Sequence, residues 1–198
     1  MALEGTLAMT YQMKESDLTL LRETGVSEPD IAHCVKVAEK ALEIAERTGA
    51  ELDLELVGRG ALFHDLGKAK THDIEHGKIG AELGVRLGLP QPILAIMEKH
   101  VRGGLTADEA MELGLPVKDY TLRTLEERIV IYSDRLVDII TDPDGIVASE
   151  GEAEERFEEI LTDNIRYGKN AQTLDRYLGY HREILGLIQG APNDRKPS

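Results

Sequence analysis

Histidine and aspartate residues in this chain stand in patterns that suit metal binding. The neighbours His64 and Asp65 lie in the stretch ALFHDLGK, residues 61–68. Adjacent residues of a helix point about 100° apart, so two neighbours reach one ion most readily where a helix ends. Gly67 is expected to supply that end, because the backbone can bend there. The stretch therefore predicts an apolar helix that delivers an imidazole and a carboxylate to a divalent ion.

Further candidate ligands lie on helical faces that the sequence pattern turns inward. His33, His100 and Asp134 each share a face with apolar residues three or four positions away. A carboxylate there is costly to bury unless it is paired, hydrogen-bonded or bound to a cation. His76 opens the stretch HGKIGAELG, where a ligand can stand between a loop and a helix. Taken alone, each histidine is more simply explained as a packed core residue than as a metal ligand. Imidazole and carboxylate ligands suit iron, manganese, cobalt or zinc, and the lack of thiolates argues against structural zinc.

The order of these residues resembles the H…HD…D signature of the HD superfamily of metal-dependent phosphohydrolases. The matching residues are His33, His64, Asp65 and Asp134. The sequence HDLG differs from the HDIG variant by one conservative change, and His76 and His100 match the additional histidines of members with two metals. The resemblance covers roughly residues 27–140. The motif His76-Gly-Lys-Ile-Gly-Ala81 is similar to one in bacterial HD-type hydrolases of symmetrical diadenosine tetraphosphate.

The resemblance implies hydrolysis of a phosphoester or phosphoanhydride bond in a small nucleotide-like substrate, through a hydroxide activated by two divalent ions. Iron or manganese is expected, with cobalt, nickel, zinc or magnesium as alternatives. Asp65 would bridge the ions as a catalytic residue. The first ion would also take His33, His64 and Asp134, and the second would take His76 and His100.

Three basic residues are candidates for binding a substrate phosphate. Lys68 follows Asp65 by three residues and could act as a catalytic point charge, or could be a solvated cation at a helix end. Arg102 and Arg135 are weaker candidates, since either could pair with a nearby carboxylate.

Two other functions stay open. One is a single-metal 5′-nucleotidase in which His76 and His100 shape the substrate pocket, and the other is a catalytically silent module that senses a nucleotide. The cyclic-di-nucleotide phosphodiesterase branch is not expected, because Val-Arg-Gly-Gly follows His100 where that branch has paired histidine and Gly-Tyr-Pro motifs.

Several other residues are expected to have no direct role. A second HD dipeptide, His72-Asp73, stands in polar sequence and reads as a surface loop. Cys34 is predicted to pack in the core. Asp138 is expected to be a surface residue or a neighbour of a ligand, and His181 is expected to be a surface residue. We expect a terminal helix to dock through an apolar stripe formed by Tyr177, Tyr180 and Ile184.

The composition predicts an all-α protein. The 198 residues suit one domain, here 1–198, with an HD-type core over roughly 27–140 and a helical extension over roughly 146–190. Aromatic residues are only 4% and Trp is absent, so the core must come from aliphatic side chains, which favours helices packed on helices.

Sequence signals predict the bounds of most helices. Expected helices begin at Ser27, Asp53, His76, Pro92, Thr106 and Thr124, and end near Gly49, Gly67, Gly88, Gly103, Gly114 and the turn at 142–145. Two further helices are expected near 152–167 and 170–189.

The charge and cysteine content limit the partners and the location. A formal charge of −14 disfavours binding to nucleic acid or anionic membranes. A single cysteine, and an N-terminal segment 1–17 without signal-peptide features, indicate a cytoplasmic protein. No apolar run approaches the roughly 18 residues that a membrane span needs. Whether the protein is a homo-oligomer stays open.

Overall fold

The computed structural model describes residues 11–191, and all regular secondary structure within that range is helical. The all-α prediction is therefore confirmed. The elements in chain order are α1 (Glu15–Thr24), α2 (Glu28–Thr48), α3 (Leu54–Phe63), η1 (Leu66–Ala69), α4 (His76–Arg86), α5 (Gln91–Lys99), η2 (Val101–Gly103), α6 (Ala107–Glu112), α7 (Leu125–Ile140), α8 (Glu150–Glu155), α9 (Phe157–Asp163), α10 (Ile165–Gly168) and α11 (Ala171–Gly190). Residues 1–10, which carry most of the segment tested for a signal peptide, lie outside the described range.

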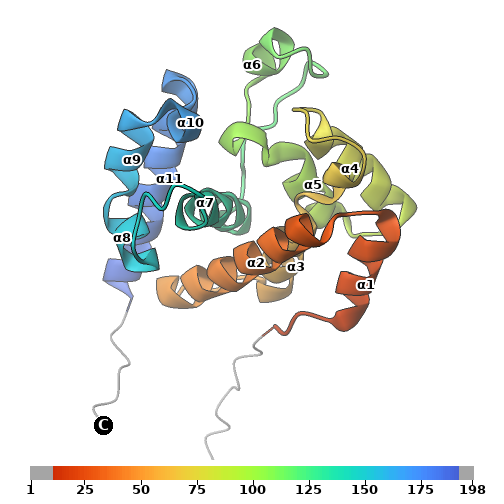
Figure 1. The fold of residues 1–198 in the computed structure, drawn as a ribbon, viewed down its shortest axis with the longest axis horizontal. Helices are drawn as coiled ribbons and strands as arrows, with labels where there is room; N and C mark the ends of the chain where they lie inside the picture. The colour runs from red at the N-terminus through yellow and green to blue at the C-terminus, as the bar shows by residue number, and fades with distance from the viewer. Residues whose placement is uncertain (1–10, 192–198) are drawn as a thin grey trace, which may run out of the picture.

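Helices α2, α3 and α7 form the centre of the molecule. Helix α2 packs against α3 and α7, and α3 also packs against α7. Figure 1 shows α4 and α5 on one side of α7 and α8–α11 on the other. The core between them is aliphatic, as the composition predicted, with Val37, Ala41, Leu62, Ile96 and Leu136 fully buried. Among the described helices, none has the length and apolar content needed to cross a bilayer.

Side-chain caps fix the start of several helices, including α2 and α7, which carry His33 and Asp134. Thr106 and Thr124, two of the expected helix starts, form capping boxes, each with the glutamate three residues later. Ser27 accepts a hydrogen bond from the Asp30 N–H, and its hydroxyl donates to the Asp30 carboxylate at 2.5 Å, so this cap lacks the reciprocal half of a box. The predicted starts of these helices are confirmed.

Gly67 has a different role from the predicted one. Helix α3 already ends at Phe63, and Asp65 leaves the helical conformation with φ −98° and ψ 14°. Gly67 lies within η1, where an added Cβ would stand 1.9 Å from the carbonyl oxygen of His76 and 2.7 Å from the nitrogen of Gly80. The missing side chain therefore lets η1 touch the backbone of α4, which brings His76 towards Asp65.

The sequence prediction was wrong at three other places. It missed α1, and it placed one helix over 152–167 where the chain forms α8, α9 and α10. His181 is buried at 5% exposure instead of lying on the surface. Its Nδ1 is 2.8 Å from the Tyr132 hydroxyl, and its ring stacks on Phe157. Helix α11 thus docks on the core more deeply than predicted.

The apolar stripe of α11 docks as predicted. Tyr177 and Ile184 are buried, and α11 packs against α2 and α7. The C-terminal helices therefore belong to the main body, near α7.

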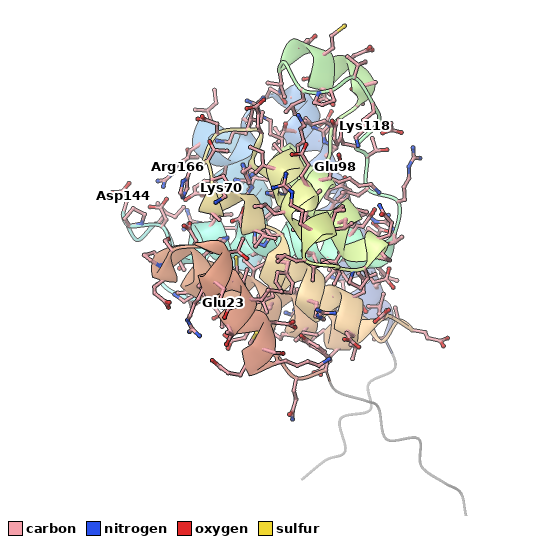
Figure 2. The ribbon with its side chains drawn as sticks, turned by 90° about the vertical axis from the view of Figure 1, so that its right-hand side faces the viewer. Glu23, Lys70, Glu98, Lys118, Asp144 and Arg166 are labelled. Atoms are coloured by element: carbon pink, nitrogen blue, oxygen red, sulfur yellow. The ribbon has the colours of Figure 1, made fainter. Side chains whose placement is uncertain are left out.

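Another segment, around α6, projects from the molecule in Figures 1 and 2. An ion pair links this segment to α5, because the Lys118 ammonium lies 2.5 Å from the Glu98 carboxylate.

Substituting Gly67 tests the contact between η1 and α4. Gly67→Ala is expected to lower the free energy of unfolding by about 1–3 kcal/mol, because the backbone of α4 must move to admit a methyl group. Gly186→Ala is the control, since α11 exposes Gly186 with nothing within 4 Å of an added Cβ. That variant should gain about 0.5–1 kcal/mol from helix propensity. Urea denaturation measures both, and changes of the same sign would contradict the packing role of Gly67.

Candidate metal centre

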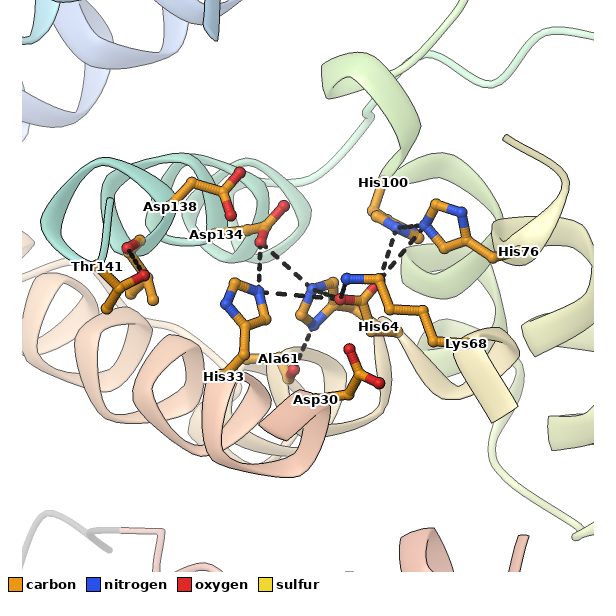
Figure 3. Close-up of polar contacts among 12 residues, drawn as sticks. Asp30, His33, Ala61, His64, Lys68, His76, His100, Asp134, Asp138 and Thr141 are labelled. Atoms are coloured by element: carbon orange, nitrogen blue, oxygen red, sulfur yellow. Dashed lines mark hydrogen bonds and ion pairs between the residues drawn. The ribbon is translucent and has the colours of Figure 1, made fainter. Parts of the chain in front are cut away.

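Five segments bring the six predicted metal ligands to one place (Figure 3). His33 lies in α2 and Asp134 in α7, whereas the other four stand at helix ends. His64 and Asp65 follow α3, His76 is the first residue of α4, and His100 follows α5. This arrangement explains how the adjacent pair His64-Asp65 serves one site: the chain bends between the two residues.

The Asp65 carboxylate lies at the centre of this cluster and divides the histidines into two pairs. Its Oδ2 is 3.8 Å from Nε2 of His33 and 3.2 Å from Nε2 of His64. Its Oδ1 is 3.4 Å from Nε2 of both His76 and His100. Asp134 Oδ1 joins the first pair, at 3.0 Å from His33 and 3.4 Å from His64. Each oxygen of Asp65 therefore faces a separate group of nitrogen donors.

Backbone carbonyls orient three of the four imidazoles. In each, Nδ1 donates its proton to the carbonyl oxygen three residues earlier at 2.7 Å; the pairs are His64 with Ala61, His76 with Asp73 and His100 with Met97. A carbonyl oxygen can only accept, so Nδ1 must carry the hydrogen. The lone pair of each neutral ring is then on Nε2, the atom that points into the cluster. This is how proteins commonly fix the tautomer of a metal-binding histidine.

His33 Nε2 has the Asp134 carboxylate as a partner at 3.0 Å, but the other three Nε2 atoms of the cluster lack the partners that they would need without a cation. Nε2 of the fully buried His64 has no hydrogen-bond partner. Nε2 of His76 and Nε2 of His100 face each other at 2.8 Å, so two lone pairs meet unless a proton or an ion lies between them. Two nitrogens bound to one ion at about 2.0–2.1 Å each lie roughly 3 Å apart. The donor set therefore fits divalent metal.

The cluster is electrostatically prepared for positive charge. Burial would raise the pKa of Asp65, but His64, His100 and His76 hold it well below the usual value. Asp134 behaves similarly, because His64 and His33 outweigh its burial. Burial would lower the pKa of His64, but the carboxylates of Asp65 and Asp134 raise it well above normal. The buried carboxylate of Asp65 and the partly buried carboxylate of Asp134 are therefore ionised and attract cations.

A cavity of about 280 Å³ opens beside the cluster and includes the three predicted phosphate-binding residues. Its lining residues are Asp65, Lys68, His72, His76, His100, Val101, Arg102, Asp134, Arg135, Asp138, Lys169 and Tyr177. The Lys68 ammonium lies 2.5 Å from Asp65 Oδ2. The buried Arg135 guanidinium donates to the Tyr177 hydroxyl at 3.3 Å and to the Asp138 carboxylate at 3.4 Å. Sequence reasoning missed Lys169 and Tyr177 as cavity residues, because only tertiary packing brings them there.

Three residues near the cluster keep secondary positions. His72 is mostly exposed and pairs with Asp30 at 3.4 Å, which fits the predicted loop. Cys34 is buried in the core, and burial raises the pKa of its thiol. Asp138 lies beside the ligands, where burial and the nearby Asp134 raise its pKa to about 6.

The fold and the cluster define an HD domain. The sequence model described as "HD domain" matches residues 30–137, and the chain belongs to this family. An uncharacterized protein of Methanocaldococcus jannaschii is 38% identical over 180 residues, which are 88% of this chain and 98% of that protein.

Other relatives share only part of their length with this chain. A tRNA (cytidine(56)-2'-O)-methyltransferase of Thermoplasma volcanium is 40% identical over 60% of this chain and 35% of its own length. Ribonuclease Y of Pseudothermotoga lettingae is 40% identical over 34% of this chain and 13% of its own. In structure, the chain is similar to the PgpH phosphodiesterase HD domain of L. monocytogenes in complex with cyclic-di-AMP. The TM-score is 0.57 at 20% identity, covering 91% of this chain and all of that domain. That likeness shows the fold.

The two HD dipeptides provide a matched test of the metal centre. His64→Ala is expected to lower Mn²⁺ affinity by at least about tenfold, because even the loss of a group that only orients a metal ligand typically lowers metal affinity by that factor. His72→Ala should leave affinity within about twofold, since His72 is mostly exposed and makes none of the cluster contacts. Titration of metal-free protein with Mn²⁺ by calorimetry measures both variants. Equal losses would show that the cluster was assigned to the wrong dipeptide.

Proposed function

We propose that this chain is a metal-dependent phosphohydrolase that cleaves a phosphoester or phosphoanhydride bond of a nucleotide-like substrate with two divalent ions. The division of four imidazoles between the two oxygens of Asp65 carries this proposal. A carboxylate that bridges two ions presents one oxygen to each, and two-metal phosphohydrolase sites place their ions about 3.5–4 Å apart.

The donor atoms assign residues to each ion. His33, His64, Asp134 and Oδ2 of Asp65 would hold the first, and His76, His100 and Oδ1 of Asp65 the second. The nitrogen and oxygen donors suit iron or manganese. When bound, such ions supply Lewis acidity, which activates water near neutral pH and stabilises charge on a phosphoryl group.

The chain itself contributes charge and orientation. Lys68 neutralises Asp65 Oδ2 and lies at the cavity wall, where its ammonium can contact a phosphate oxygen. The carbonyls of Ala61, Asp73 and Met97 keep three imidazoles aimed at the centre, so the donors need no rearrangement when an ion binds. The cavity of about 280 Å³ is near the lower end of the range for small-molecule pockets, so it has room for phosphate groups while a larger substrate would project from it.

The names of the relatives support a substrate with phosphate linkages. Cyclic-di-AMP is bound by the Listeria domain, and ribonuclease Y is named for action on RNA. The motif His76–Ala81, which is similar to one in diadenosine tetraphosphate hydrolases, favours no particular substrate. Cβ atoms at Gly77 and Gly80 would contact the Met97 carbonyl and the Gly67 nitrogen at 2.9 and 3.0 Å, so those glycines serve packing.

Asp65→Ala tests the proposed activity. The variant is expected to retain less than a tenth of wild-type turnover, because both ions would lose their shared ligand. This corresponds to an activation barrier raised by more than about 1.4 kcal/mol. The control is Asp144→Ala, because Asp144 is exposed and lies outside the cavity lining, and this variant should stay within about twofold. Phosphate release from a nucleotide panel in Mn²⁺ measures activity, and circular dichroism checks that helical content persists. Retained turnover in Asp65→Ala would disprove the catalytic site.

Metal content separates a two-metal enzyme from a single-metal 5′-nucleotidase. Anaerobically purified wild type should contain about two ions per chain, and His76→Ala and His100→Ala about one, because their nitrogens face only Oδ1 of Asp65. Elemental analysis measures the ratio. A single ion in wild type that both variants keep would favour the nucleotidase, with these histidines shaping the pocket.

A further inference from the structure

A group of basic residues lies beside the metal centre of this acidic protein. The cavity is lined by four basic side chains, although the chain as a whole has a formal charge of −14. Lys68 is paired with Asp65, which leaves Arg102, Arg135 and Lys169, here called the basic cluster. The ion pairs among the described residues include neither Arg102 nor Lys169, whereas Arg166, close to Lys169 in the chain, pairs with Asp142. Two cations of the cluster are therefore free to bind an anion.

Backbone strain marks the same two residues. Within residues 11–191, Arg102 and Lys169 are the only non-glycine residues with positive φ, at 52° and 61°. Lys169 combines this φ with ψ −82°, a backbone conformation that residues other than glycine rarely adopt. Such strain is typically kept where it serves function. Here both strained residues are basic and line one cavity, although they are far apart in the sequence.

The third member of the cluster is held rigidly. Arg135 is 8% exposed, and its guanidinium lies 4.7 Å from the centre of the Tyr177 ring. The Tyr177 hydroxyl and the Asp138 carboxylate accept hydrogen bonds from it, but its buried Nε has no partner. Asp138 offsets the charge of Arg135, so among the described residues Arg102 and Lys169 are the cations of the cavity without an ion-pair partner, opposed only by Asp134 of the metal centre.

The cations of the cluster also repel one another. Partial burial, together with Arg135 and Arg102, lowers the pKa of Lys169 below its usual value. A bound anion would relieve this repulsion. A planar guanidinium beside an ammonium suits phosphate oxygens especially well, because guanidinium can donate two parallel hydrogen bonds.

We propose that Arg102, Arg135 and Lys169 form an anion subsite that holds a second phosphate group of the substrate, next to the phosphate at the metal centre. This inference rests on the proposed hydrolase function and narrows the substrate class to compounds with at least two phosphate groups. Lys169 and Tyr177 lie beyond residues 30–137, the part that matches the HD family. The C-terminal helices therefore supply a specificity-determining residue that the family core lacks.

Binding of inorganic phosphate to metal-free protein tests the subsite without any turnover. Lys169→Met keeps the aliphatic stem but removes the charge, and it should weaken phosphate binding by about tenfold, the value of one charge-assisted hydrogen bond. Lys169→Arg should keep most of the affinity. The control is Lys70→Met, because Lys70 is exposed and lies outside the cavity lining. It should change affinity less than about twofold. Unchanged binding in Lys169→Met would overturn the proposal.

A glycine variant separates the charge of Lys169 from its backbone conformation. Lys169→Gly should raise the midpoint of urea denaturation, because glycine adopts this φ and ψ without strain, yet it should bind phosphate as weakly as Lys169→Met. Higher stability with wild-type phosphate affinity would exclude Lys169 from the subsite.

Turnover of paired substrates then tests the substrate class. With Mn²⁺-loaded protein, Lys169→Met should lower kcat/KM for ADP about tenfold while changing that for AMP less than about twofold. Equal losses for the two would overturn the second-phosphate role. Absence of turnover by wild type would contradict the proposed hydrolase function alone, because phosphate binding by metal-free protein is measured separately.

Discussion

The buried carboxylate of Asp65 is the constraint on which the site depends. It is 2% exposed and surrounded by side chains from α2, η1 and α4 and from the residues that directly follow α3 and α5. A lone carboxylate in such a place would be strongly destabilising, so each surrounding element must supply a compensating group. That requirement explains why four imidazoles and an ammonium converge on one residue. It also explains why η1 and α4 approach so closely at Gly67, since a wider gap would take His76 away from Oδ1.

Sequence reasoning located the residues that form the cluster because local signals governed their positions. His33 and Asp134 stood on helical faces with apolar neighbours, and Thr124 marked the start of α7 through its capping box. The residue type and the position within the helix were then enough to predict that both side chains point towards the core. The match of order to the HD signature supplied the remaining step, the pairing of residues from distant helices. Periodicity alone could not have supplied that pairing.

Errors arose where packing or weak signals decided the structure. Helix α1 has no side-chain cap at Lys14, so its start lacked the capping signal that marked α2 and α7. His181 stands beside Arg182 and Glu183, which suggested a surface position. Its spacing from Tyr177 and Ile184 places all three on one buried face, a signal that could have corrected the interpretation. Lys169 reaches the cavity only through the docking of the C-terminal helices, which no local pattern encodes.

The imidazole–carbonyl hydrogen bonds join the metal site to the ends of helices. Ala61 and Met97 lie in the last turns of α3 and α5, where carbonyl groups lack helical partners and carry the negative end of the helix dipole. His64 and His100 cap these carbonyls through Nδ1. Each ring thus transmits the helix's partial negative charge to the atom that faces the ion, making it a stronger base. In return, an ion that binds Nε2 makes the ring a better donor and tightens the last helical turn. Occupancy of the metal centre would therefore be thermodynamically linked to fraying of α3 and α5, because each of the two proposed ions would reinforce the end of one helix through its histidine.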